Sequence, residues 1–215
     1  MNNITKLLCS VACLAATSVS AKDLEVTHWW TSGGEAAAVS TLAKAFNAKT
    51  EHNWVDGAIA GGGGTSIPAI ISRIIGGEPM GATQLNHGRQ AQELIEAGLM
   101  TDLTEIAEAQ GWRDIVNPVS LLDSCTVDGR VYCVPVNIHS AQWLWVSHGA
   151  FEKAGLAIPT NWDEFVAGSA ELEKNGIVPL AMGQQGWQQS IAFGALVLGV
   201  VGVDKFLEVT GNKNA

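Results

Sequence analysis

The stretch that decides the fold is VTHWWTSGGE, which covers Val26–Glu35. It ends a run of β-forming residues, Asp23–His28, and leads into an alanine-rich run with helical spacing, Glu35–Lys49. This order predicts a strand, a short loop with two glycines, and a helix. Because open α/β sheets bind ligands beside the loops at the carboxyl ends of their strands, the loop is a candidate binding site.

Two adjacent tryptophans, Trp29 and Trp30, lie where this strand ends, and Glu35 opens the helix. An indole face can stack on the C–H face of a sugar ring, and a carboxylate can accept hydrogen bonds from its hydroxyl groups. The alternative interpretation is that the indoles belong to the core. Adjacent residues of a strand point to opposite faces, so a core role fits one tryptophan more readily than both.

Composition limits the class of protein. Of 215 residues, 47% are hydrophobic and 15% are charged, which suffices for one domain with a core, or one and a half. The formal net charge of −9 disfavours nucleic acid and anionic membranes as partners. Eight tryptophans against one tyrosine favour a stacking ligand such as carbohydrate, with ordinary use in the core as the alternative.

Residues 1–21 predict a secretory signal peptide. Lys6 is followed by the apolar run Leu7–Ala16 and by the small residues Val19–Ala21. We predict cleavage after Ala21 and export to the periplasm, since the segment is too short to span a membrane. A lipid-modified Cys13 is the alternative.

Cys125 and Cys133 remain in the exported chain and flank Asp128-Gly129, a strong hairpin signal. Across a two-residue turn the two cysteines are predicted to face each other. Because an exported protein lies in an oxidising compartment, we predict a disulfide, with two small buried side chains as the alternative. Two thiols without a clustered histidine pair do not predict a zinc site, and no other metal or cofactor is expected.

Strand–helix alternation continues after the first helix and predicts a parallel sheet with helices on both faces. The glycine run Gly61–Gly64 has no lysine after it, so it predicts a flexible loop rather than a phosphate-binding loop. Asn86, His87 and Arg89 lie in the loop after the third strand, which makes them site candidates on topology alone. The expected elements are strands Asn53–Ala60 and Ala82–Leu85, a helix Ser66–Ile75 capped by Thr65 or Ser66, a helix ending at Gly98, and short helices within Leu99–Ile115.

The pattern changes after the hairpin. The β-rich run Val131–Val146 is longer than an ordinary strand and is interrupted by Pro135 and by polar residues, so it predicts two strands that cross between two lobes. A second α/β pattern follows. It predicts a helix ending at Gly155, a helix capped by Thr160 with Trp162 as a packing residue at its start, a strand Ile177–Met182, a polar aromatic loop Gly183–Gln189, and a helix Ser190–Val200.

Three motifs together resemble the extracellular solute-binding proteins of sugar ABC transporters, the glucose type most closely and maltose-binding protein more distantly. They are WWTSGGE at residues 29–35, YCVPVNIH at residues 132–139, and FEKAGL followed by PTNWDEF within residues 151–165. The resemblance covers Asp23 to about Leu207. It implies two-lobe periplasmic-binding-protein (type II) architecture of the α/β class, closing on sugar as a clamshell.

The resemblance also implies a division of the chain into a first lobe at 22–136, a hinge strand at 137–146, and the start of a second lobe at 147–215. Relatives of this type return to the first lobe after the second. We therefore expect the chain to be a fragment or the product of a truncated reading frame, with an incomplete second lobe and poor sugar binding on its own.

By position, the resemblance implies a set of sugar contacts from both lobes. It implies a monomer that takes a mono- or small oligosaccharide to an ABC permease, without enzymatic activity. The identity of the sugar stays open, because glucose-type relatives tend to carry a lysine near Asn86 and this chain has none there. The implied residues are Trp29, Trp30 and Glu35 on the first-lobe wall, Asn86, His87 and Arg89 on the sugar hydroxyls, Asn137 and His139 at the hinge, and Gln185 and Trp187 on the second-lobe wall.

An exported carbohydrate-active enzyme and a lectin-like module are the alternatives. A glycosidase needs two carboxylates flanking one bond, and the candidate loops offer Glu35 with asparagine, histidine, arginine and glutamine instead. The Gly-x-Ser-x-Gly pattern of a hydrolase nucleophile is absent from the sequence. A lectin-like module predicts no clamshell closure.

Overall fold

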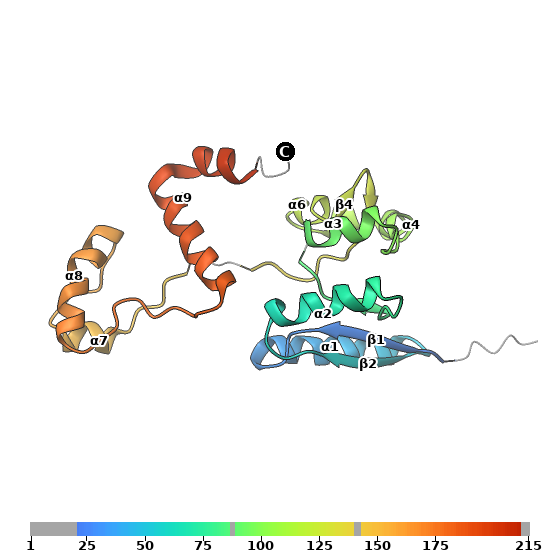
Figure 1. The fold of residues 1–215 in the computed structure, drawn as a ribbon, viewed down its shortest axis with the longest axis horizontal. Helices are drawn as coiled ribbons and strands as arrows, with labels where there is room; N and C mark the ends of the chain where they lie inside the picture. Colours follow the sequence, from blue (N-terminus) through green and yellow to red (C-terminus); the bar gives the residue numbers. More distant parts are fainter. Residues whose placement is uncertain (1–20, 87–88, 140–142, 212–215) are drawn as a thin grey trace, which may run out of the picture. The chain divides into compact units, whose positions relative to one another are not determined.

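The computed structural model describes residues 21–86, 89–139 and 143–211 (Figure 1). The predicted signal peptide lies outside the described residues, apart from Ala21. The chain divides into two compact units, Met1–Pro135 and Val136–Ala215, and each is described by itself. The assignment of residues 137–146 to a hinge stays a prediction.

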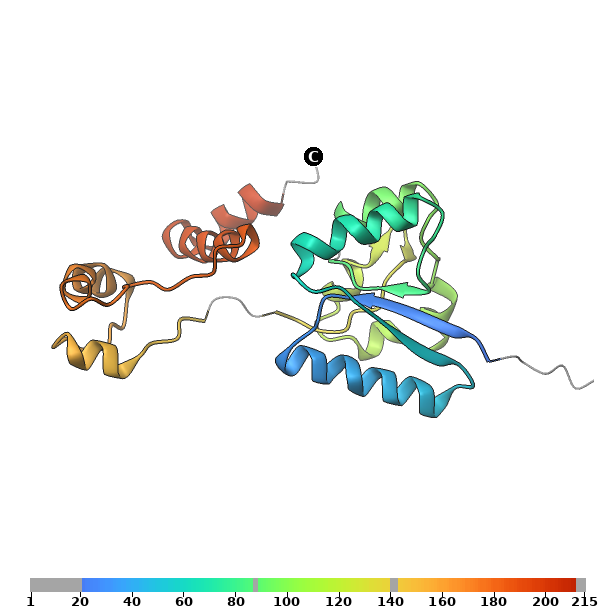
Figure 2. The same ribbon diagram turned by 60° about the horizontal axis from the view of Figure 1, so that its bottom comes forward.

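The first unit is built on a three-stranded parallel sheet with the order β2-β1-β3. The first connection runs from the central strand β1 to β2 at one edge, and the second runs back across β1 to β3 at the other edge. Right-handed connections therefore place the two intervening helices on opposite faces, as Figure 2 shows for α1 and α2. The predicted parallel sheet with helices on both faces is confirmed. The elements are β1 (Asp23–His28), α1 (Gly33–Lys49), β2 (Asn53–Ala58), α2 (Gly63–Ile75) and β3 (Ala82–Thr83).

Helix α2 supplies two of the four buried residues of the core cluster beside the sheet. Its fully buried Ile70 packs with Ile74, Met80 and Leu94, the last of these on α3 (Arg89–Glu96). The helix begins earlier than the sequence suggests, because Gly62 adopts a φ of 72° that a residue with a side chain rarely takes. The prediction of Thr65 or Ser66 as its cap was therefore wrong. The Ser66 hydroxyl is buried and is shared between the backbone carbonyls of Gly62 and Ile59, both at 3.0 Å.

An ion pair ties β1 to α2. The Arg73 guanidinium donates to both carboxylate oxygens of Glu25, at 2.6 and 2.9 Å. These bonds hold the pKa of Glu25 below its usual value. The two side chains are 39% and 35% exposed, so solvent screens the pair and its contribution to stability is modest.

This pair predicts a pH-dependent effect of Glu25→Gln. A carboxyl whose pKa is lowered by folding contributes stability above its unfolded pKa of about 4.3, and that contribution is lost as the pH falls through the folded pKa. We expect the melting temperature of the variant to lie below that of the native chain at pH 7 and to converge with it in more acidic solution. Thermal melts across this range check the prediction, with Glu51→Gln at an exposed loop position as control. A difference that stays constant with pH would contradict it.

The rest of the first unit is a group of short helices against a hairpin. Their shared core consists of Ala107, Leu122, Cys125 and Val131. The turn residues Asp128 and Gly129 have φ of 48° and 78°, the pattern of a two-residue type I′ hairpin. The predicted hairpin, β4 (Thr126–Val127) and β5 (Arg130–Val131), and the short helices predicted within Leu99–Ile115, α4 (Thr104–Ala109) and α5 (Trp112–Ile115), are present. A further short helix, α6 (Ser120–Asp123), was not predicted.

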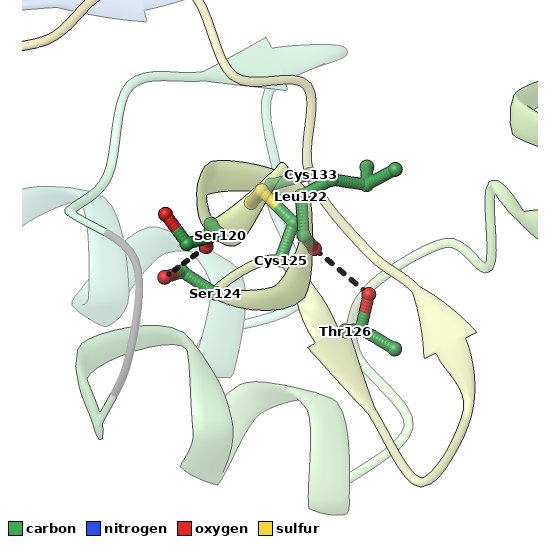
Figure 3. Close-up of a disulfide and its surroundings, with 6 residues drawn as sticks. All are labelled: Ser120, Leu122, Ser124, Cys125, Thr126 and Cys133. Atoms are coloured by element: carbon green, nitrogen blue, oxygen red, sulfur yellow. Dashed lines mark hydrogen bonds between the residues drawn. A yellow bond between two sulfur atoms is a disulfide. The ribbon is translucent and has the colours of Figure 1, made fainter. Parts of the chain in front are cut away.

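Cys125 and Cys133 form a disulfide with a Cα–Cα distance of 5.1 Å (Figure 3). The disulfide between these two cysteines was predicted correctly. The expectation that they lie directly opposite each other in the hairpin was wrong by one residue. The ladder pairs Thr126 with Val131, and the amide of Tyr132 bonds to the carbonyl of Cys125. Cys125 therefore lies opposite Tyr132, and the disulfide joins it to the next residue along, just beyond the end of the hairpin.

We predict that the disulfide stabilises this subdomain. The cysteines are 8 residues apart, and closing a loop of that size contributes about 2.5 kcal/mol in the chain-entropy model. A Cys125→Ala/Cys133→Ala variant is expected to lose about this much free energy of unfolding in urea titrations. Intact mass after alkylation checks the premise, because two free thiols in exported protein would contradict it.

The second unit opens with two helices, α7 (His148–Lys153) and α8 (Trp162–Lys174). Phe151 and Ala154 pack there against Phe165 and Leu172. Helix α7 ends as expected: Gly155 has a φ of 69°, and the amide of Leu156 bonds back to the carbonyl of Phe151.

Helix α8 is capped one residue later than predicted. The side chain of Asn161, not Thr160, accepts the amide of Glu164 at 2.9 Å. Thr160 instead donates its amide and hydroxyl to the Glu164 carboxylate. Thr160 and Asn161 thus each make part of the capping interaction with Glu164, whereas the sequence predicted Thr160 alone as the cap.

The strands predicted within Val131–Val146 and at Ile177–Met182 were wrong. Residues 177–182 are irregular, and the described residues after Val131, through 139 and from 143 to 147, contain no strand. A strand needs a neighbour to satisfy its N–H and C=O groups, and the described part of the second unit offers no strand to pair with. The β-forming side chains of these segments therefore do not determine their structure.

Helix α9 (Gly186–Gly211) is longer than the predicted Ser190–Val200 and is broken at Gly202, where φ is 77° and ψ is 170°. Its segment Gly186–Thr210 is long and apolar enough to cross a membrane by length and composition alone. The uninterrupted part before Gly202 spans only about 24 Å at 1.5 Å per residue, less than the ~30 Å hydrocarbon core of a bilayer. The break therefore argues against a single straight span.

Candidate functional site

The three strands of the first unit end at the same edge of the sheet, because they are parallel. This brings together the Trp29–Trp30 loop after β1, the glycine loop before α2, and Gln84 after β3. The amide of Trp29 donates to the side-chain oxygen of Gln84 at 3.1 Å. A Cβ on Gly63 would lie 3.6 Å from two ring carbons of Trp29, so the indole lies over the start of α2.

The two tryptophans differ in how much of each is available. Trp29 is half-buried and packs against the cluster around Ile70. Trp30 is only 8% exposed. Trp29 is therefore the more exposed of the two indoles, whereas Trp30 belongs to the core. The predicted site role of both residues stays a prediction.

His28 directly precedes the tryptophan pair in the sequence and is 4% exposed. Its Nε2 lies 2.5 Å from the Asp56 Oδ1 on β2, and its Nδ1 accepts the amide of Trp30 at 3.2 Å. The strand edge is thus joined to the loop by side chains as well as by the backbone.

The remaining candidates of the first unit are less constrained. Glu35 is exposed in the first turn of α1, where its charge complements the helix dipole. Asn86 is exposed after β3. His87 lies outside the described residues. Arg89 begins α3, and its side chain lies outside the described part of the chain.

The second unit brings Gln185 and Trp187 together at the start of α9. The Trp187 Nε1 donates to the Gln185 side-chain oxygen at 2.6 Å, and the indole is 54% exposed. Asn137 and His139 are also neighbours, with 2.8 Å between the Asn137 Nδ2 and the His139 Nε2, and both are exposed. Each pair presents polar groups at the surface, and Trp187 adds an aromatic face.

Sequence reasoning missed His28, Asp56 and Gln84 as parts of this edge. His28 was predicted as the last residue of its strand and Gln84 as an interior residue of its strand, and the structure places each polar side chain at or just beyond the carboxyl end of its strand. That position is the signal that could have identified them. Among the residues that the structure describes, no group of three histidine, cysteine, aspartate or glutamate side chains could hold a metal ion.

Comparison with known proteins gives a consistent result. The model of the family described as bacterial extracellular solute-binding protein matches residues 30–214. A "Probable sugar-binding periplasmic protein" of Rhizobium meliloti (strain 1021) is 39% identical over 187 residues, which are 86% of this chain and 44% of that protein. One of the same description from Brucella melitensis biotype 1 is 38% identical over 184 residues, 85% of this chain and 43% of that protein.

The fold is shared with solved structures at low sequence identity. A structure described as "Chitin oligosaccharide binding protein" superposes with a TM-score of 0.63 at 18% identity, covering 84% of this chain and 46% of that one. The α/β fold is therefore that of the periplasmic binding proteins. The chain spans less than half the length of these curated relatives.

Proposed function

We propose, because this chain belongs to the bacterial extracellular solute-binding protein family, that its protein binds a sugar outside the cytoplasmic membrane for uptake by an ABC transporter. The relatives described as probable sugar-binding periplasmic proteins support a sugar as the ligand. The family and these relatives are binding proteins rather than enzymes. The predicted signal peptide, with its predicted cleavage after Ala21, supports release into the periplasm.

The observation that carries the proposal is the tryptophan loop at the carboxyl edge of the parallel sheet. Its main-chain amides donate to the side chain of His28 at the end of β1 and to that of Gln84 just after β3, and Trp29 keeps part of its indole exposed. An aromatic side chain beside carboxylate and amide groups matches a pyranose, because the C–H groups of the sugar ring can stack on the indole and its hydroxyl groups can bond to the polar groups.

In this proposal the other unit contributes a second wall to the same sugar. Trp187, with its amide partner Gln185, supplies an aromatic face there, and Asn137 and His139 lie at the connection between the lobes. Glu35, Asn86, His87 and Arg89 bond to hydroxyl groups from the first lobe. The ligand is a mono- or small oligosaccharide, and the monomeric binding protein delivers it to the permease subunits.

A thermal-shift screen with monosaccharides and small oligosaccharides tests the proposal. Because the chain spans less than half of its relatives, the screen uses a fusion of residues 22–215 with the part of the Rhizobium meliloti relative that follows the matched region. We expect at least one sugar to raise the melting temperature of the fusion, and the 215-residue chain to respond weakly or not at all. A fusion that folds and responds to no sugar would contradict the proposal. Sugar-induced compaction in X-ray scattering separates a clamshell from a rigid lectin-like module.

A further inference from the structure

The last residue of β1, His28, occupies an unusual position between a strand and the ligand loop. Its side chain is 6% exposed and bridges two partners that belong to different segments. One partner is the Asp56 carboxylate on β2, and the other is the backbone amide of Trp30, two residues further along the chain.

The two bonds together define the protonation of the ring. Because the Trp30 amide can only donate, Nδ1 must be the unprotonated nitrogen that accepts it. The single proton of the neutral ring then lies on Nε2, where it is donated to the Asp56 carboxylate. A carboxylate at this position selects this tautomer, so the two bonds support each other.

The Trp30 amide needs such a partner because the sheet ends before it. The last backbone bonds from the neighbouring strands are Gln84 N–H to the Thr27 carbonyl and Ile59 N–H to the His28 carbonyl, both at 2.8 Å. Trp30 is 8% exposed, and a buried amide without an acceptor is costly. The His28 Nδ1 therefore accepts the hydrogen bond that a backbone carbonyl of a neighbouring strand would accept if the sheet continued.

We propose that His28 is a positioning residue: by linking the Trp30 amide to Asp56 on β2, it fixes the main chain that carries Trp29 and Trp30 before a ligand arrives. The proposal rests on the proposed function for what the tryptophan pair does. His28 itself is too buried to face a sugar. A loop that is already ordered loses less conformational freedom on binding, which favours affinity.

Backbone amide hydrogen exchange, followed by NMR in the 215-residue chain, tests this role. In His28→Leu the Trp30 amide is expected to exchange about tenfold faster, as expected for loss of one hydrogen bond. The Ile59 amide, which bonds to the backbone carbonyl of residue 28, is the internal control and is expected to change little. In Asp56→Ala the ring is no longer held, and an intermediate acceleration at Trp30 is expected.

His28→Asn is the rescue variant. An asparagine side chain can accept the amide two residues further on, as the His28 Nδ1 does, so slow exchange of Trp30 is expected to return. Unchanged exchange at Trp30 in His28→Leu would overturn the proposal. So would equal acceleration at Trp30 and Ile59 in both His28 variants, because that pattern indicates a general loss of stability. No sugar enters this experiment, so failure of the proposed function would appear only in the binding measurements.

Discussion

Replacing Trp29 by alanine is expected to weaken sugar binding by the fusion protein about tenfold to a hundredfold. The substitution removes the half-exposed indole at the carboxyl edge of the sheet. Aromatic residues that stack on a ligand contribute about 1–3 kcal/mol, and 1.4 kcal/mol corresponds to a tenfold change in Kd. Isothermal titration calorimetry with the sugar found in the screen measures the effect.

Two further variants separate stacking from stability. Trp29→Phe keeps an aromatic face against the Ile70 cluster and is expected to retain most of the affinity. Trp162→Ala removes an indole that is 43% exposed and stacks on Phe165 with 5.0 Å between ring centroids. It is expected to lower the melting temperature with little change in Kd. Equal losses of affinity in Trp29→Ala and Trp162→Ala would show that the binding effect follows from instability.

Ile70→Ala is expected to give the largest loss of stability in the first unit, about 2–5 kcal/mol in free energy of unfolding. The side chain is fully buried in the cluster that also supports Trp29, so alanine leaves a cavity under the ligand loop. Urea titration monitored by circular dichroism measures the loss in the 215-residue chain.

The same helix offers a matched control for this substitution. Ile75→Ala truncates the same side chain at a position that is 67% exposed, and the expected loss is below about 0.5 kcal/mol. Similar losses in the two variants would contradict the assignment of the core to the face of α2 that carries Ile70.

Local chemistry made much of the first unit predictable. The strand before Trp29 and the hairpin at Asp128-Gly129 follow from patterns within a few residues, and both are present in the structure. The pairing of Cys125 with Cys133 was found in the same way. The sequence did not predict that Cys133 lies one residue beyond the position opposite Cys125, because register depends on how the whole hairpin pairs rather than on the turn alone.

The interactions that shape the candidate site could not be predicted, since they connect distant parts of the chain. His28 and Asp56 are 28 residues apart, and Trp29 and Gln84 are 55 residues apart. No local pattern encodes such contacts, which become visible only when the strands are aligned. The expected strand at Ile177–Met182 failed for a related reason, because a strand needs a partner that its own sequence does not specify.

The assignment of the tryptophan loop as a sugar-binding wall is tested most directly by calorimetric titration of the fusion protein and of its triple variant Trp29→Ala/Trp30→Ala/Glu35→Ala. Circular dichroism first establishes that the variant is folded, since Trp30 is buried. We predict that the fusion binds its sugar and that the folded triple variant shows no measurable heat of binding at the same concentrations. Tight binding that survives the loss of all three side chains would contradict the account.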